Sequence, residues 1–265
     1  MALNPYTSIE HGQPGRVGCL IHYLEETPST QEVARALAAD GAPQGTVVIA
    51  ERQSAGRGRM GRGWHSPPGV NLYMTVILRP RIALAEVARL SLVAGVAVAE
   101  AVETVAPGLV QLKWPNDVWL RGRKAGGIIA EAVSDQHLHL DCVLLGIGLN
   151  LNLSAEQIPP ELRGRATSVF IATGRQCDRV AVANSLFLRL QSRYMETETH
   201  GFGAVREAWE RYSALTGKRV TAVDAGTRLT GTVAGIDSDG ALLLDTADGQ
   251  RRIVAADVTL EGAYD

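Results

Sequence analysis

The pattern of apolar and polar residues predicts strands along most of the chain. Short runs of β-branched and aliphatic residues favour strands, because these side chains pack well on a pleated surface. The run Thr-Val-Val-Ile-Ala at residues 46–50 is apolar at successive positions, which is typical of a buried strand. We expect strands at residues 16–24, 46–50, 70–79, 111–114, 117–120, 124–133 and 138–149.

Helices are predicted where apolar residues recur at helical spacing. Ser29 is a good N-cap, and Glu32 three positions later would complete a capping box at the start of the first helix. Further helices are expected at residues 84–106, where alanines and Gly95 indicate close packing, and at residues 179–194 and 202–215. Hairpin-like spacing of the strands predicts an α+β fold, with a mixed, largely antiparallel sheet and helices packed on one face.

The composition changes at Thr216-Gly217, and short strands follow. They are expected at residues 218–222, 228–236, 241–245 and 251–254. Asp239-Gly240 and Asp248-Gly249 mark tight turns between them. We therefore expect two domains, at residues 1–215 and 216–265, the second of which is a small all-β module.

Composition and charge narrow the class of protein. Of the 265 residues, 46% are hydrophobic and 20% charged, which is ordinary for a globular protein. A net charge of −2 argues against a dedicated DNA-binding protein, although it is compatible with a local basic loop. Cys19, Cys142 and Cys177 form no metal-binding pattern and suit a reducing cytoplasm. We expect no signal peptide in residues 1–18 and no membrane span.

A stretch rich in glycine and arginine follows the strand at residues 46–50. Residues 51–64 read Glu-Arg-Gln-Ser-Ala-Gly-Arg-Gly-Arg-Met-Gly-Arg-Gly-Trp. Glycines let the backbone approach a ligand closely, and arginines are planar, bidentate donors to phosphate and carboxylate. The stretch predicts a loop that closes over an anionic ligand. Taken alone, it is also compatible with a solvated basic loop or a contact with nucleic acid.

Residues 56–61 also match the G-x-G-x-x-G pattern of dinucleotide-binding turns. That pattern requires a helix that opens at the glycines and an acidic residue about 20 positions later. Residues 63–69 contain two prolines and cannot begin a helix, and the acidic position falls near Arg79-Pro80-Arg81. We therefore reject a Rossmann fold.

Three further motifs follow this loop in order. They are Lys-Trp-Pro-Asn-Asp at residues 113–117, Gly-Arg-Lys-Ala-Gly-Gly-Ile at residues 122–128 and Gly-Ile-Gly-Leu-Asn-Leu-Asn at residues 146–152. Together with the loop, this set closely resembles the biotin protein ligases, from about Tyr23 to the C-terminus. The resemblance implies a class II aminoacyl-tRNA synthetase/biotin ligase-like domain followed by a small SH3-like β-barrel. Because few residues precede Tyr23, we expect the monofunctional type without an N-terminal DNA-binding domain.

The resemblance implies a two-step reaction. The biotin carboxylate attacks the α-phosphorus of ATP to give biotinyl-5′-AMP and pyrophosphate, and a lysine amine of a biotin carboxyl carrier protein then attacks this anhydride and releases AMP. The carrier is expected to be a subunit of acetyl-CoA carboxylase or a related acyl-CoA carboxylase. Mg²⁺ is expected with the pyrophosphate leaving group, although the sequence offers no all-protein metal site. We expect a cytoplasmic enzyme, monomeric or weakly dimeric, that binds neither DNA nor membrane.

The resemblance also assigns candidate site residues. Lys124, Arg57 and Arg59 are the expected catalytic residues, since a lysine can bridge two anions as a point charge. The expected biotin contacts are Ser29, Thr30, Gln31, Gln53, Arg57, Gly58, Arg59, Lys124, Gly126 and Gly127. The expected ATP contacts are Arg59, Arg62, Trp64, Lys113, Asn116, Lys124, Asn150 and Asn152.

Several of these residues also have simpler interpretations. Ser29 is explained by its role as an N-cap alone. Gln31 stands where the family usually has asparagine, so its contact with biotin is open. Asn150 and Asn152 fit a turn of polar residues nearly as well, and Trp64 fits a packing anchor. No histidine is placed as a general base for the second step.

Two other functions remain as alternatives. A lipoate–protein ligase is related in fold and carries a comparable lysine, but it lacks the combination of the Gly-Arg loop with Lys-Trp-Pro-Asn-Asp. A nonenzymatic module that binds the carrier protein is the other alternative. We also expect residues 55–65 to be mobile without ligand and ordered with it, because the anhydride must be shielded from water.

Overall fold

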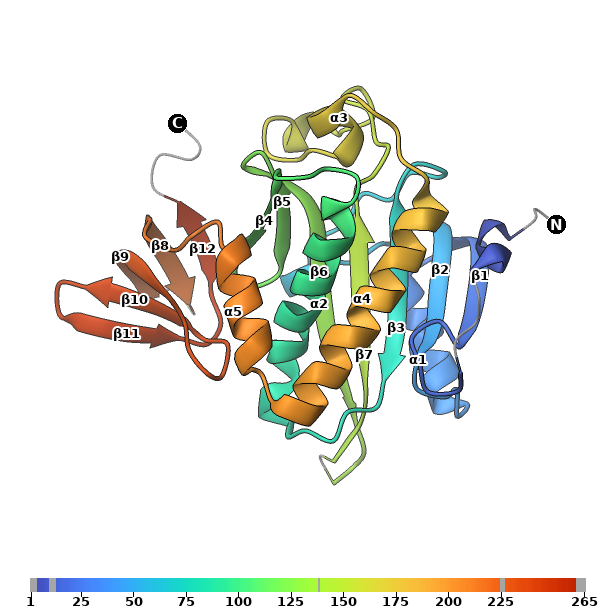
Figure 1. Ribbon diagram of the computed structural model, residues 1–265, viewed down its shortest axis with the longest axis horizontal. Helices are drawn as coiled ribbons and strands as arrows, with labels where there is room; N and C mark the ends of the chain where they lie inside the picture. The colour runs from blue at the N-terminus through green and yellow to red at the C-terminus, as the bar shows by residue number, and fades with distance from the viewer. Residues whose placement is uncertain (1–3, 10–12, 138, 225–226, 261–265) are drawn as a thin grey trace.

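A seven-stranded sheet forms the centre of the computed structural model, which describes residues 4–9, 13–137, 139–224 and 227–260 (Figure 1). Its strands lie in the order β1-β2-β3-β7-β6-β5-β4. They are β1 (Leu20–Thr27), β2 (Thr46–Gln53), β3 (Leu72–Leu78), β4 (Val110–Lys113), β5 (Asp117–Leu120), β6 (Arg123–Ser134) and β7 (Leu140–Leu149). Only β1 and β2 pair in parallel among the described strands of this sheet, so the expected mixed, largely antiparallel sheet is confirmed.

The described residues contain five α-helices, which pack around this sheet. They are α1 (Thr30–Ala39), α2 (Val87–Glu103), α3 (Val169–Thr173), α4 (Arg179–His200) and α5 (Gly203–Tyr212), with short 3-10 turns at Pro5–Ser8, Arg59–Gly61, Leu84–Glu86 and Pro160–Leu162. Helices α2, α4 and α5 lie together over one face of the sheet (Figure 1). Helix α2 packs closely there, since a Cβ at Gly95 would lie 3.6 Å from Leu112 and 3.8 Å from Ile128.

Helix α1 covers the opposite face, so the expectation that the helices share one face is wrong. Its buried Ala34 and Ala38 pack against Val48 of β2, whereas the preceding Val47 faces the larger core. Successive residues of Leu72–Leu78 are also all buried. A strand that is apolar at every position is covered on both faces, and this requires helices on both sides of the sheet.

The boundaries of several elements differ from the prediction. Strand β1 begins at Leu20 and helix α4 continues to His200, and residue 138, where we expected β7 to begin, lies outside the described residues. Helix α3 was not predicted, because its five residues are too few to show a periodic pattern. Its start is fixed by Ser168, whose Oγ accepts a hydrogen bond from the Ile171 amide at 3.0 Å.

A second sheet of five antiparallel strands follows α5. Its strands are β8 (Arg219–Asp224), β9 (Thr227–Ile236), β10 (Leu242–Thr246), β11 (Gly249–Ile253) and β12 (Asp257–Leu260), in the order β11-β10-β9-β8-β12. This is the predicted all-β module, and the turn expected at Asp248-Gly249 joins β10 to β11. Strand β12 was missed, because it is short and buries little apart from Val258. The boundary at residues 215 and 216 stays a prediction.

In the part of the chain that the structure describes, no helix combines the length and the apolar character needed to cross a membrane.

Candidate functional site

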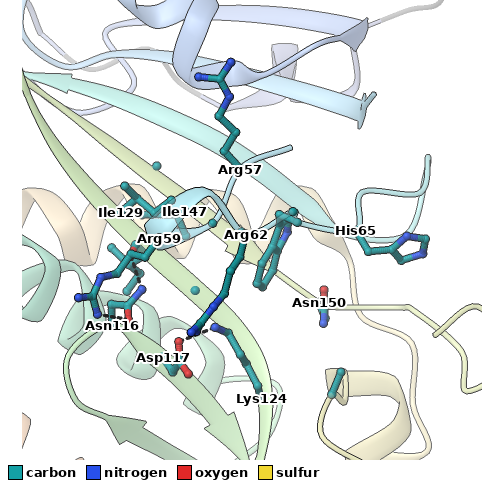
Figure 2. Close-up of a pocket in the computed structure, with 18 of the residues that line it drawn as sticks. Arg57, Arg59, Arg62, His65, Asn116, Asp117, Lys124, Ile129, Ile147 and Asn150 are labelled. Atoms are coloured by element: carbon teal, nitrogen blue, oxygen red, sulfur yellow. Dashed lines mark hydrogen bonds and ion pairs between the residues drawn. The ribbon is translucent and has the colours of Figure 1, made fainter. Parts of the chain in front are cut away.

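A cavity of about 640 Å³ is lined by the glycine- and arginine-rich loop, the strands of the central sheet and β12. Figure 2 shows residues of the loop and the central sheet that line it. Every candidate residue lines it except Gly126 and Asn152. Motifs that are far apart in the sequence therefore meet at one place.

We expected Gly126 to contact biotin and Asn152 to contact ATP, but neither residue lines the cavity. Successive residues of β6 face opposite sides, and a Cβ at Gly126 would meet the Gly148 carbonyl oxygen at 3.1 Å and Val118 at 3.2 Å, away from the cavity. Gly127 faces the cavity instead. The Asn152 amide is hydrogen-bonded to the main-chain oxygen and nitrogen of Cys177, both at 2.9 Å, so it braces the segment before α4.

The N-terminus of α1 forms one end of the cavity. Ser29 and Thr30 are almost completely buried there. Gln53, at the end of β2, accepts hydrogen bonds from the Thr30 amide at 2.9 Å and the Thr30 hydroxyl at 3.2 Å. Ser29 Oγ accepts from the Gln31 amide at 3.3 Å, so Ser29 is the N-cap as expected. The expected capping box is not formed, because the Glu32 carboxylate is paired with Arg57 instead.

Gln31 keeps one polar atom without a partner. Its Nε2 donates weakly to Glu131 at 3.4 Å and to the Leu144 carbonyl at 3.5 Å, whereas its buried Oε1 has no hydrogen-bond partner among the described residues. Gly146 gives this amide its space, since a Cβ there would lie 3.2 Å from it. A buried acceptor without a partner costs about 1–3 kcal/mol, so a ligand that donates a hydrogen bond here would remove that cost.

The glycine- and arginine-rich loop folds back on itself. The Gly58 amide donates to the Arg62 carbonyl at 2.6 Å, and the Trp64 amide donates to the Gly56 carbonyl at 2.8 Å. These bonds close a narrow hairpin, which places Met60 at its tip with a φ of 56° and a side chain that is 75% exposed.

Three arginines of the loop, Arg57, Arg59 and Arg62, point in different directions (Figure 2). Arg57 extends away from the other two toward Glu32, with 63% of its side chain exposed. Arg59 donates to the Asn116 Oδ1 at 3.2 Å. Arg62 forms an ion pair with Asp257 of β12, which connects the loop to the second sheet.

Trp64 lies against the glycine-rich strand β7. A Cβ at Gly148 would meet the indole ring at 2.6 Å, and one at Gly127 would meet it at 3.2 Å. Gly148 is therefore required for this position of the ring, and Gly127 leaves it room. The indole Nε1 is buried without a hydrogen-bond partner among the described residues.

The two lysines of the cavity have different partners. Lys124 Nζ lies 2.5 Å from the Asp117 carboxylate and 5.6 Å from the centre of the Trp64 ring. Lys113 Nζ lies 5.1 Å from the centre of the Trp119 ring. Burial lowers the pKa of Lys113 below its usual value, an effect that the charge of Asp117 opposes and that of Lys124 strengthens.

The two asparagines of the cavity wall are held by main-chain groups. Asn116 Nδ2 donates to the Ile128 carbonyl at 2.8 Å, which leaves its Oδ1 facing Arg59. Asn150 Nδ2 donates to the Thr167 carbonyl at 3.0 Å, and its Oδ1 accepts from Asn71 at 3.2 Å. These two bonds hold the Asn150 side chain in the cavity wall, and its contact with ATP stays a prediction.

Sequence reasoning missed several residues that line the cavity. They are Met74, Trp119, Ile129, Ile147, Leu153, Ile158, Pro159, Leu162, Arg165, Ala166, Asp257, Val258 and Thr259. Residues 165–167 pair with Lys124 through main-chain bonds, and the Gln157 carbonyl lies 3.1 Å from Nε2 of His65. Residues 153–166 and 257–259 carry no motif, so no signal in the sequence placed them here, whereas Ile147 lies within the motif at residues 146–152.

The cavity combines an apolar wall with an excess of cationic side chains. Met74, Ile129 and Ile147 supply apolar surface, while Arg59, Arg62, Lys113 and Lys124 supply fixed positive charge. Such a site suits a ligand that has an apolar body and an anionic group. Among the described residues, no cluster of three or more His, Cys, Asp or Glu side chains could hold a metal ion by itself.

Comparisons with known proteins agree with this geometry. Residues 23–150 match the family model described as the biotin/lipoate A/B protein ligase family, and residues 215–260 match the biotin protein ligase C-terminal domain. The bifunctional ligase/repressor BirA of Bacillus spizizenii is 39% identical over 90% of this chain and 73% of the relative. The chain belongs to the biotin protein ligase family.

The match with this chain extends over nearly the full length of two further relatives in the ligase family. The biotin–[acetyl-CoA-carboxylase] ligase of Paracoccus denitrificans is 34% identical over 90% of this chain and 100% of the relative. The biotin protein ligase of Aquifex aeolicus, solved in complex with biotin and ATP, has a TM-score of 0.79 and 31% identity over 91% of this chain and 98% of that chain. The two matched segments, residues 23–150 and 215–260, both contribute to the cavity wall.

Proposed function

We propose that this chain joins biotin to ATP in the cavity and then transfers the biotinyl group to a lysine of a carrier protein. The observation that carries this proposal is the gathering of Lys124, Asp117, Arg59 and Arg62 beside an apolar wall in a chain of this ligase family. The match to the biotin protein ligase C-terminal domain favours this function over that of a lipoate–protein ligase.

In the first step, a biotin carboxylate oxygen bonds to the α-phosphorus, and the bond from this phosphorus to the bridging oxygen of pyrophosphate breaks. The step brings two anions together, so it needs fixed positive charge where negative charge develops. Lys124 leaves Asp117 to bridge the carboxylate and the α-phosphate. Arg59 and Arg62 contact the phosphates, with Arg59 oriented by Asn116.

The apolar part of biotin lies against Met74, Ile129 and Ile147. Its ureido ring is bound at the α1 end of the cavity, where Ser29, Thr30 and Gln53 offer both donors and acceptors. The unpartnered Gln31 Oε1 accepts a hydrogen bond from a ureido N–H. Gln31 thereby takes the place of the asparagine that is usual at this position in the family.

In the second step, the carrier lysine amine attacks the carbonyl carbon of the anhydride. The new C–N bond forms, the bond from this carbon to the phosphate oxygen breaks, and AMP leaves. Arg59 and Lys124 balance the charge on the departing phosphate. Trp64 covers the anhydride and limits the access of water, which would otherwise hydrolyse it.

Mg²⁺ accompanies the ATP. Asp117 and Asn116 offer a carboxylate and an amide oxygen on the cavity wall, and Mg²⁺ usually takes one or two such ligands together with phosphates and water. The donor set therefore fits an ion that is carried in by the nucleotide. Bound there, Mg²⁺ would neutralise charge on the phosphates.

The partner of the ligase is a biotin carboxyl carrier protein subunit of an acyl-CoA carboxylase. This assignment follows the name of the Paracoccus denitrificans relative, a biotin–[acetyl-CoA-carboxylase] ligase. We place the enzyme in the cytoplasm, as a monomer or weak homodimer that binds neither DNA nor membrane.

The proposal is tested by exchange of labelled pyrophosphate into ATP. Exchange should depend on biotin, should not occur with lipoate, and should be lost in Lys124→Ala. Lys218→Ala is the control, because Lys218 is an exposed lysine outside the cavity. Exchange with lipoate alone would establish a lipoate ligase, and no exchange with either acid would favour a nonenzymatic binding module.

A further inference from the structure

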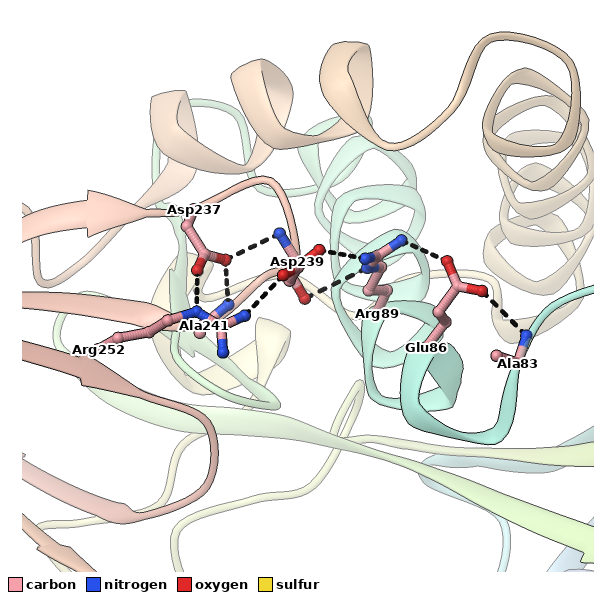
Figure 3. A network of polar contacts seen from close by, with 7 residues as sticks. All are labelled: Ala83, Glu86, Arg89, Asp237, Asp239, Ala241 and Arg252. Carbon is pink, nitrogen blue, oxygen red and sulfur yellow. Dashed lines mark hydrogen bonds and ion pairs between the residues drawn. The ribbon is translucent and has the colours of Figure 1, made fainter.

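The turn between β9 and β10, residues 237–241, attaches the second sheet to helix α2 (Figure 3). We call it the docking turn. Arg89 on α2 donates to the Asp239 carboxylate and to the Asp239 main-chain oxygen, the latter at 3.3 Å. Arg252 on β11 bonds to both Asp237 and Asp239. A charged network therefore joins α2 to the docking turn and to strand β11.

Hydrogen bonds within the docking turn hold its conformation. The Asp237 carboxylate accepts hydrogen bonds from the amides of Asp239 at 2.8 Å and Ala241 at 2.9 Å. Arg89 is held from its other side by Glu86 at 2.6 Å, and only 23% of its side chain is exposed. Because other contacts already restrain both the docking turn and the Arg89 side chain, little conformational entropy is lost when the two bind each other.

Gly240 brings the backbone of the docking turn against helix α2 and Trp114. Its φ is +80°, and a Cβ there would lie 2.6 Å from the side chain of Leu92 on α2. Only glycine satisfies both conditions without strain. Its carbonyl oxygen accepts a hydrogen bond from Nε1 of Trp114 at 2.9 Å, and Trp114 is 2% exposed.

Trp114 connects the docking turn to the cavity. It stands between Lys113 and Pro115-Asn116, and all of these residues line the cavity wall. The second sheet also contributes residues 257–259 of β12 to the same wall. The docking turn thus bonds directly to the corner at residues 113–116, and β12 belongs to the same sheet as the turn, joined to β9 through β8.

We infer that the docking turn positions the ATP-binding part of the cavity, and that Arg89 and Gly240 are positioning residues for the ATP-dependent step. The inference rests on the proposed function. The α1 N-terminus, β2 and β7, where biotin is expected to bind, have no contact with the docking turn among the hydrogen bonds and ion pairs of the described residues. Loss of the turn should therefore affect ATP more than biotin.

The test compares Arg89→Met with Arg79→Met. Arg79 is a matched control, since its side chain is 29% exposed, pairs with Asp141 and donates to the carbonyls of Ala38 and Ala42, away from the docking turn. In pyrophosphate exchange, we expect Arg89→Met to raise the KM for ATP about tenfold, because small displacements of positioning groups cost one to two orders of magnitude. The KM for biotin should stay within about twofold, as it should for both substrates in Arg79→Met.

Two further variants separate positioning from a general loss of stability. Trp114→Phe keeps an aromatic ring but leaves the Gly240 carbonyl without its donor, so it should raise the KM for ATP in the same direction. Arg89→Lys keeps the charge beside Asp239 and should recover part of the effect. Thermal unfolding of every variant identifies those that are merely unstable, and the KM values of the folded fraction still decide the question.

The outcomes distinguish the two proposals. Wild-type exchange with biotin, together with a raised KM for ATP in Arg89→Met and an unchanged one in Arg79→Met, supports both. Wild-type exchange with equal KM values in Arg89→Met and Arg79→Met, or equal shifts for ATP and biotin, overturns the positioning role and leaves the ligase. No biotin-dependent exchange in the wild type overturns the proposed function, and the positioning role with it.

Discussion

The two sides of the cavity are built in different ways. On the sheet side, Lys124 and Asp117 lie on paired strands, with 38% and 17% of their side chains exposed. On the loop side, residues 56–64 carry Arg57 and Arg62, whose side chains are 63% and 67% exposed. The sheet side is held by a ladder of main-chain bonds, whereas the loop side is held by one narrow hairpin and a few ion pairs.

This difference indicates which side sets the chemistry and which side responds to the ligand. Exposed ion pairs contribute about 0–1 kcal/mol, so the loop arginines can leave Glu32 and Asp257 at little cost. The main chain of Lys124 is fixed on a paired strand, so only its side chain has to move from Asp117 to the ligand, and such limited reorganisation favours electrostatic catalysis. We therefore expect substitutions on the sheet side to have larger effects than those on the loop side.

The largest effect is expected for Lys124→Ala. Loss of a fixed charge at the reacting centre should lower kcat for biotin-dependent pyrophosphate exchange about 10²- to 10³-fold. Thermal unfolding should change little, because Lys124 is partly exposed. A decrease no larger than that of Lys218→Ala would contradict the central role of the sheet side.

The next largest effect is expected for Lys113→Met. Removing a charged hydrogen-bond donor should lower kcat/KM for ATP about 10- to 100-fold, and should leave the protein as stable or more stable. Burial lowers the pKa of Lys113 below 10.5, so the folded protein binds this proton less tightly than the unfolded chain does. The cost of the charged lysine is full below the folded pKa and disappears as the pH rises to 10.5.

The stabilisation by Lys113→Met should therefore be greatest near neutral pH and smallest near pH 10.5. Urea unfolding at several pH values measures it. A variant that is less stable than the wild type at neutral pH would show that Lys113 gains more from its surroundings than it loses by burial.

Gly148→Ala tests the contact between the two sides. The added Cβ would meet the Trp64 ring at 2.6 Å, so either the loop moves or the protein loses about 1–3 kcal/mol of stability. We expect the loop to move, with a change in tryptophan fluorescence that is absent in a Trp64→Phe background. Gly203→Ala is the control, because a Cβ at Gly203 has no heavy atom within 4 Å. Unchanged fluorescence with lower stability would show a rigid loop.

The smallest effect is expected for Glu32→Gln, which releases Arg57 from its ion pair. The KM for biotin should fall by less than about fivefold, since an exposed pair contributes at most about 1 kcal/mol. Glu26→Gln is the matched control, because Glu26 pairs with Arg52 and both side chains are 51% exposed. A loss of activity would indicate that the pair with Glu32 holds Arg57 in its working position.

Much of the fold and most of the cavity could be predicted from the sequence. The motif residues are contiguous within each segment, so local pattern and resemblance identified Ser29, Gln53, Arg59 and Lys124 as parts of one site. The sequence could not decide between Gly126 and Gly127, because alternation along a strand shows that neighbours face opposite sides but not which side is the cavity. Only the register of β6 against β7 settles that.

The sequence by itself determined the chemical groups of the site, since glycines, arginines and Lys124 stand in short motifs whose chemistry is local. The tertiary structure alone decided that α1 covers the opposite face of the sheet, that Arg57 turns toward Glu32 and that the second sheet completes the cavity. Arg62 and Asp257 are 195 positions apart, and Trp114 and Gly240 are 126 apart. Contacts of such separation depend on how whole elements pack, and no local pattern records them.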